Sequence, residues 1–177
     1  MTTLIILLTA VVLFFSYTIW ALKKIGFIPN SWSDGFFELK EKGWTWQLFM
    51  VLMGILFFGL TLELLEGYFF QFLGFLVSIS VAFVGAAARF RHGTDLESRV
   101  HYGFAYLAAG ASLALIILSA IYISWIAAVF ATVTALICLL WYKYRRNHKT
   151  KVFWAEYACF GWTFMLLVYL ALQKAGI

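Results

Sequence analysis

A few ionisable and hydroxyl side chains stand out because the rest of the chain is almost entirely apolar. His101, Asp34 and Glu156 each carry a group that could hold a proton or a metal ion, and Ser33 directly precedes Asp34. Ionisable side chains inside or beside long apolar segments are costly to bury, so they are functional candidates by default. We therefore take His101, Asp34, Glu156 and Ser33 as the candidate catalytic residues.

Two chemistries could use these side chains. Histidine nitrogens and carboxylate oxygens can bind zinc with one position open for an activated water, and the candidate ligands are His92, His101 and Glu156. The chain has no HxxxH or HExxH spacing, and no other cofactor is predicted. The alternative is a hydrogen-bonded network of His101, Glu156 and Asp34, either static or responsive to protonation.

The elements that position these residues are expected to be membrane-spanning helices. The chain is 64% hydrophobic and 12% charged, whereas soluble domains carry about 25% charged residues. A helix needs about 20 apolar residues to cross a bilayer, where its backbone must bond to itself. Six such segments are predicted, which gives an all-α bundle in a single domain over residues 1–177. They are 3–22, 46–65, 68–88, 102–121, 123–142 and 154–173.

The basic residues predict the orientation of this bundle. Twelve of the thirteen lie in the first, third and fifth connections between the predicted spans. These connections share one side of the membrane only if the chain crosses six times, and basic connections stay cytoplasmic. The sequence therefore predicts a multi-pass protein of the cell (inner) membrane with both termini outside. All four candidate catalytic residues then lie toward the cytoplasmic face.

The fifth connection is the most basic segment, and it could bind anionic lipid headgroups. Its basic residues are Lys143, Arg145, Arg146, Lys149 and Lys151. Topology alone also explains these charges, so the net charge of +5 does not indicate nucleic acid. The expected partners are membrane lipids, a second copy of the chain or another membrane protein.

A second polar cluster is expected on the outer face. Glu63 lies near the end of an apolar segment and Glu66 follows three residues later, so the two are neighbours on a helix. Lys174 is the only basic side chain expected on that side. We predict that Lys174 pairs with Glu63 or Glu66. The alternative is that the two carboxylates form the mouth of a proton or cation path.

The segment 26–45 connects the first two spans and is expected to lie at the cytoplasmic interface. Ser31 or Ser33 is expected to cap a helix that has Asp34 in its first turn, where negative charge is favoured. The stretch DGFFELKEKG suits a short amphipathic helix on the membrane surface.

Small residues recur along one face of the segment 68–88, and the segment 102–121 has a matching face near His101. The two sets are Gly74, Ser78, Ala82 and Ala86, and Ala105, Ala108, Ser112 and Ser119. Small residues let helix backbones approach closely in lipid. We therefore expect these two segments to form the close-packed centre of the bundle.

Several stretches resemble known groups of membrane proteins. IPNSWSDGFFEL, AFVGAAARF, VHYGFAYLAAG and FWAEYACF are similar to parts of six-span proteins from bacteria and their phages, in which a Pro-Ser-x-Ser-Asp loop follows the first helix and Val-His begins the fourth. No activity is assigned to that group, so this resemblance implies only a fold. The loop serines and His101 also resemble the DRAM and Sfk-type six-span proteins.

SISVAF (Ser78–Phe83) resembles the serine-containing part of the alkaline ceramidase and adiponectin-receptor superfamily. That resemblance implies a zinc hydrolase within the membrane. The chain departs from the pattern, because the histidine expected soon afterwards and the HxxxH of the final helix are both absent.

Three functions fit these features. The first is a non-enzymatic membrane protein that binds a lipid or a partner through its cytoplasmic face. The second is a zinc-dependent membrane lipid hydrolase. The third is a transporter of a small solute or ion, with Glu63 and Glu156 at opposite ends of its path. The spans lack the breaks that form midplane transport sites, and no ligand spacing indicates zinc, so the first function is favoured.

Overall fold

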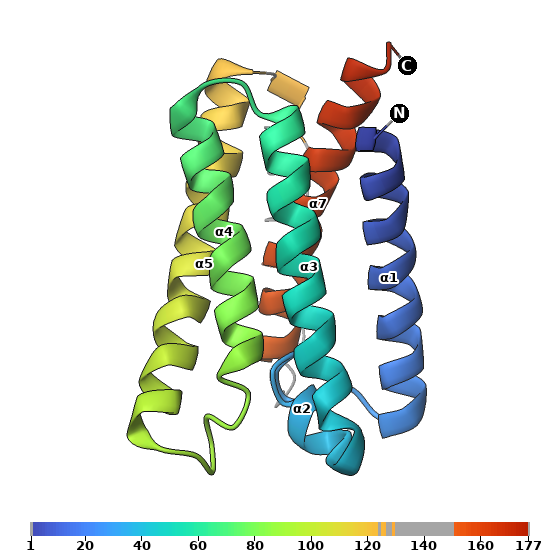
Figure 1. Ribbon diagram of the computed structural model, residues 1–177, viewed down its shortest axis with the longest axis vertical. Helices are drawn as coiled ribbons and strands as arrows, with labels where there is room; N and C mark the ends of the chain where they lie inside the picture. Colours follow the sequence, from blue (N-terminus) through green and yellow to red (C-terminus); the bar gives the residue numbers. More distant parts are fainter. Residues whose placement is uncertain (1, 124, 127–128, 130–150, 177) are drawn as a thin grey trace.

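A computed structural model of the protein describes residues 2–123, 125–126, 129 and 151–176 (Figure 1). Within these residues the chain is all-helical and contains no strand, which confirms the predicted fold class there. The long helices are α1 (Thr2–Ile25), α3 (Gly43–Leu64), α4 (Tyr68–Ala86), α5 (Asp95–Tyr122) and α7 (Lys151–Lys174). The short helix α2 (Gly35–Glu38) and the 3-10 turn η1 (Lys40–Lys42) lie between α1 and α3.

Within the described residues, four helical segments are long and apolar enough to cross a membrane. They are Thr2–Ile25, Lys40–Leu64, Tyr68–Ala86 and Asp95–Tyr122. Large apolar side chains such as Ile5, Ile55 and Phe69 are more than half exposed on the outside of the bundle, as expected where lipid surrounds the helices. These features support the predicted membrane location. Most of the predicted span 123–142 lies outside the described residues.

Helix α3 is the centre of the bundle, since it contacts α1, α4, α7 and α2. Its largest buried side chains include Trp46, Phe49, Met53 and Phe57, each at most 2% exposed. Figure 1 shows α3 between α1 and α4, with α7 behind it and α5 on the far side of α4.

Helix α4 packs along α5 as expected, but its small face is turned toward α3. A Cβ atom added to Gly74 would lie 2.5 Å from Cγ2 of Thr61, and one added to Gly54 would lie 2.7 Å from the carbonyl oxygen of Ser78. The connection between α3 and α4 spans only residues 65–67, and Gly67 takes a φ of 87° that favours glycine. This short turn makes α3 and α4 antiparallel neighbours at close range.

The two ends of the bundle differ in charge. We call the end with α2 and the connection between α4 and α5 the loop end, and the end with both termini the terminal end (Figure 1). The loop end carries basic residues on several of the elements that reach it: Lys23 and Lys24 in the last turn of α1, Lys40 and Lys42 in η1, Arg89 and Arg91 after α4, and Arg99 near the start of α5. Glu63, Glu66 and Lys174 belong to the terminal end.

Helix α5 begins seven residues earlier than the predicted span. The hydroxyl of Thr94 accepts a hydrogen bond from the backbone N–H of Glu97 at 3.2 Å, and the Glu97 carboxylate accepts one from the backbone N–H of Thr94 at 2.8 Å. This capping box satisfies the free amides of the first turn. It extends the helix beyond the apolar segment to the loop end, where His101 then lies inside the helix.

Candidate functional site

The segment Asn30–Asp34 is folded into the loop end of the bundle. Ser31 is 9% exposed, Ser33 4% and Asp34 1%. The Ser31 hydroxyl accepts a hydrogen bond from the backbone N–H of Asp34 at 3.1 Å, and Asp34 is the residue that precedes α2. Ser31 therefore closes the turn before α2, but the predicted serine N-cap is wrong: Asp34 is the N-cap residue of this four-residue helix, and no described side chain caps it.

Trp32 anchors the segment between two long helices. Its ring is stacked against Phe14 of α1 with centroids 6.3 Å apart, and it contacts Phe153 of α7 at 5.3 Å. The Trp32 side chain is 8% exposed. Burial of such a ring gives a large apolar contribution to stability, so the segment is held in place by packing as well as by hydrogen bonds.

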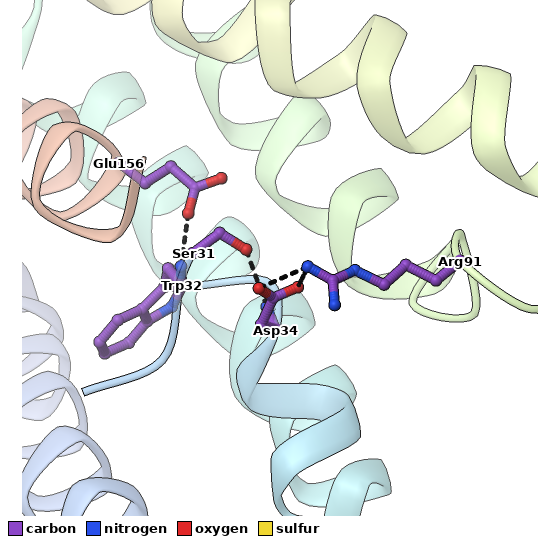
Figure 2. A network of polar contacts seen from close by, with 5 residues as sticks. All are labelled: Ser31, Trp32, Asp34, Arg91 and Glu156. Carbon is purple, nitrogen blue, oxygen red and sulfur yellow. Dashed lines mark hydrogen bonds and ion pairs between the residues drawn. The ribbon is translucent and has the colours of Figure 1, made fainter. Parts of the chain in front are cut away.

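Glu156 joins α7 to this segment (Figure 2). Its Oε2 atom accepts a hydrogen bond from the backbone N–H of Trp32 at 2.5 Å, and the backbone of Ser33 also bonds the carboxylate. Nearby, the backbone N–H of Phe153 donates to the carbonyl oxygen of Asn30 at 3.0 Å. The carboxylate is thus fixed by main-chain donors, and its other oxygen is turned away from the segment in Figure 2.

Arg91 pairs with Asp34 across the loop end. Nη2 of Arg91 lies 2.6 Å from Oδ2 and 2.5 Å from Oδ1 of Asp34, and this is the only ion pair within the described part of the chain. The Asp34 side chain is 2% exposed and that of Arg91 is 43% exposed. The guanidinium also lies 5.8 Å from the ring centroids of both Phe37 and Phe90. This pair ties the connection between α4 and α5 to the first connection.

His101 is buried between α5 and the end of α4. Its Nδ1 lies 3.2 Å from the carbonyl oxygen of Ala87; because a carbonyl only accepts, Nδ1 carries the proton. The ring is stacked on Phe90, with centroids 3.8 Å apart and planes at 14°. His101 has no hydrogen bond to Asp34 or Glu156 among the contacts of the described residues. The predicted network of three residues is therefore split between two sites.

The predicted zinc ligands lie in different surroundings. His92 packs perpendicular to the Phe37 ring with centroids 5.4 Å apart, His101 bonds the carbonyl of Ala87, and Glu156 bonds the backbone of Trp32. Among the side chains that the structure describes, no three His, Cys, Asp or Glu residues lie close enough together to hold a metal ion.

At the terminal end, Lys174 contacts Glu63 through the main chain. Its Nζ donates to the carbonyl oxygen of Glu63 at 2.6 Å, and the Glu63 carboxylate accepts a hydrogen bond from the hydroxyl of Thr3 at 3.1 Å. The carbonyls of the last helical turn lack partners within the helix, and α3 ends at Leu64. Lys174 satisfies such a carbonyl, while Glu66 is exposed.

Four of the five residues predicted to bind lipid headgroups lie outside the part of the chain that the structure describes. These four are Lys143, Arg145, Arg146 and Lys149, and Lys151 begins α7.

A cavity of about 400 Å³ lies among α3, α4, α5, α7 and the segment Asn30–Asp34. Glu156 and Ser33 line it at the loop end, and small residues of α5 line one side. The remaining lining residues are mostly apolar. The described lining residues are Trp32, Ser33, Met50, Phe57, Val77, Val81, Val84, Tyr102, Ala105, Tyr106, Ala108, Ala109, Ser112, Glu156 and Thr163.

The small face of α5 therefore borders the cavity. Ala105, Ala108 and Ser112 have side chains too short to fill the space between α5 and α7. The sequence predicted the small face of α5 but not the cavity beside it, because small residues permit either close helix packing or a cavity. The cavity reaches the side of the bundle at α5, where Tyr106 is 77% and Tyr102 47% exposed.

No protein-family model, curated protein or solved structure matches the chain. Functional inference therefore rests on the geometry of this cavity and its polar end.

Proposed function

We propose that the chain is a six-span membrane protein that binds one membrane lipid or related amphiphile in the cavity, without catalysing a reaction. The observation that carries this proposal is the shape and polarity of the cavity. It is apolar along α4 and α5, it ends at Glu156 and Ser33, and it reaches the lateral surface beside Tyr106. Its volume of about 400 Å³ falls within the roughly 300–1,000 Å³ of small-molecule sites.

The charge of the bundle indicates where the polar end of the cavity lies in the membrane. If the basic loop end is cytoplasmic, Glu156 and Ser33 lie near the cytoplasmic interface and the apolar part of the cavity extends toward the bilayer centre. An amphiphile of the cytoplasmic leaflet has the same arrangement of head and chain. A lateral opening would admit it directly from the lipid phase.

Transport and hydrolysis receive less support from the same cavity. The described lining residues end at Phe57 of α3, Val77 of α4 and Ser112 of α5, short of Glu63 at the terminal end. A path with Glu63 and Glu156 at its two ends would need lining beyond these positions. Hydrolysis with zinc would need three ligands in one place, and His92, His101 and Glu156 lie apart in the described structure.

Native mass spectrometry of the protein released from lipid nanodiscs tests this function. The wild type is expected to retain one lipid per chain. Ser112→Phe puts a ring into the cavity and should remove this lipid, whereas Leu113→Phe should not, because Leu113 is 59% exposed on the outside of α5. Ala108→Phe serves as a second cavity variant if Ser112→Phe fails to fold. Equal lipid retention in the wild type and a folded cavity variant would contradict the proposal.

A further inference from the structure

The polar end of the cavity carries a carboxylate and no described cation. Glu156 is the only Asp, Glu, Lys or Arg side chain among the described lining residues. Arg91, the half-exposed cation nearby in the loop end, is paired with Asp34 and does not line the cavity. The field at this end therefore favours a positive group on the ligand and opposes a negative one.

Glu156 is positioned to bind such a group. Its Oε2 atom is held by the backbone of Trp32, and the other oxygen is turned away from the segment (Figure 2). A carboxylate has about four lone-pair sites, so two main-chain donors leave acceptor capacity for a ligand. The hydroxyl-bearing residues Ser33 and Thr163 line the same cavity.

Aromatic side chains of α5 also line the cavity. Tyr102 and Tyr106 come from successive turns of α5, and both line the cavity with Glu156. The face of a tyrosine ring attracts ammonium groups, by about 0.5–1 kcal/mol when exposed and about 2 kcal/mol when desolvated. A cavity lined by a carboxylate and by aromatic rings is a chemical environment suited to an alkylammonium ion.

We propose that the amphiphile bound in the cavity carries an ammonium head group, which pairs with Glu156 and contacts Tyr102 and Tyr106. Its alkyl chain lies along Ala105, Ala108 and Ser112. This inference rests on the proposed function and adds the charge class of the ligand. The ammonium group could belong to a lipid headgroup or to a free amine amphiphile.

Equilibrium dialysis of the full chain in dodecyl maltoside micelles tests this charge class. Three radiolabelled probes share one alkyl chain: dodecyltrimethylammonium, dodecanol and dodecyl sulfate, each corrected for protein-free micelles. We expect one dodecyltrimethylammonium per chain, at least tenfold tighter than the other two. Glu156→Gln should weaken this probe at least tenfold. Glu66→Gln makes the same chemical change at an exposed site and should have no effect.

A second variant guards against a general loss of structure in Glu156→Gln. Tyr106→Ala removes a ring that is 77% exposed, so the core is unchanged. It should weaken dodecyltrimethylammonium several-fold and leave dodecanol unchanged, and Tyr106→Phe should restore binding. Displacement of the probe by dioctanoylphosphatidylethanolamine would assign the ammonium group to a lipid headgroup, and no displacement would assign it to a free amine.

The outcomes separate the two proposals. If dodecanol or dodecyl sulfate binds as tightly as dodecyltrimethylammonium and Glu156→Gln changes nothing, the ammonium head group is wrong while the lipid-binding function stands. If none of the three probes binds above the protein-free micelles, and Ser112→Phe also leaves lipid retention unchanged, both proposals fail.

Discussion

At the scale of single residues, the ion pair between Arg91 and Asp34 joins the two connections at the loop end. Asp34 is almost fully buried, whereas Arg91 is 43% exposed. Solvent screens the attraction from the arginine side. The larger effect comes from the buried carboxylate, which would lose its cation if Arg91 were removed.

Arg91→Ala should therefore destabilise the protein by about 1–3 kcal/mol, the usual cost of leaving a buried polar group unsatisfied. Arg89→Ala is the matched control, because Arg89 is exposed on the same connection and belongs to no ion pair of the described residues. Adding Asp34→Asn to Arg91→Ala should recover part of the loss, because the unpaired charge is then gone. Heating the purified proteins in detergent measures the loss of folded protein. Equal stability of the two arginine variants would rule out a stabilising pair.

The sequence predicted part of this site. Asp34, Ser33 and Glu156 were expected at one face, and the structure places all three around the segment Asn30–Asp34. Arg91 was read only as a topology charge, because its pairing depends on how the connection after α4 folds over α2. The prediction paired Lys174 with the carboxylate of Glu63 or Glu66, whereas in the structure Lys174 donates to the main-chain carbonyl of Glu63. A sequence does not show which oxygen of a residue an amine will reach.

At the scale of elements, close approach of α3 and α4 depends on glycines that face the partner helix. A Cβ atom on Gly54 would lie 2.7 Å from the Ser78 carbonyl oxygen and 3.0 Å from Cβ of Ala82. Both are backbone or rigid atoms, so the helices would have to separate. Gly110 of α5, in contrast, has no atom within 4 Å of an added Cβ.

Gly54→Ala should lower stability by about 1–3 kcal/mol, the usual cost of overpacking. Gly110→Ala should leave stability unchanged or raise it by up to about 1 kcal/mol, because alanine favours a helix over glycine. Thermal unfolding in detergent compares the two variants with the wild type. A Gly54→Ala protein as stable as Gly110→Ala would show that the two helices do not touch at this position.

Element boundaries were predictable where a local motif fixes them. The start of α5 at Asp95 follows from the Thr94 and Glu97 capping box, which is visible in the sequence as TDLE. The prediction began this helix at residue 102, because it followed hydropathy alone. The sequence did not predict what the small faces of α4 and α5 would contact. Small residues at every fourth position permit close packing on another helix or leave room for a cavity, and the spacing does not show which helix lies opposite.

At the scale of the whole molecule, composition and charge predicted the all-helical fold and the membrane location. Both termini lie at one end and the basic first and third connections at the other (Figure 1). We propose six spans with both termini outside, and a topology assay tests this orientation.

Fusion of alkaline phosphatase to the C-terminus should give an active enzyme in a bacterial host, and fusion of green fluorescent protein at the same place should be dark. Each reporter can also be inserted next to His92, in the connection after α4. There the phosphatase should be inactive and the green fluorescent protein should be fluorescent. The reason is that the basic connections remain cytoplasmic. A fluorescent C-terminal fusion would contradict the proposed orientation.

Lipid binding in the cavity is tested most directly by finding where a membrane lipid contacts the protein. A phospholipid with a photoactivatable diazirine on its acyl chain, reconstituted with the protein in liposomes, labels the residues it touches, and mass spectrometry identifies them. The account predicts labelling concentrated on the cavity walls, at Val77–Val84 of α4 and Ala105–Ser112 of α5, and lost in Ser112→Phe. Labelling of exposed faces such as Ile5 and Ile55 to the same degree as the cavity walls, unchanged in that variant, would contradict it.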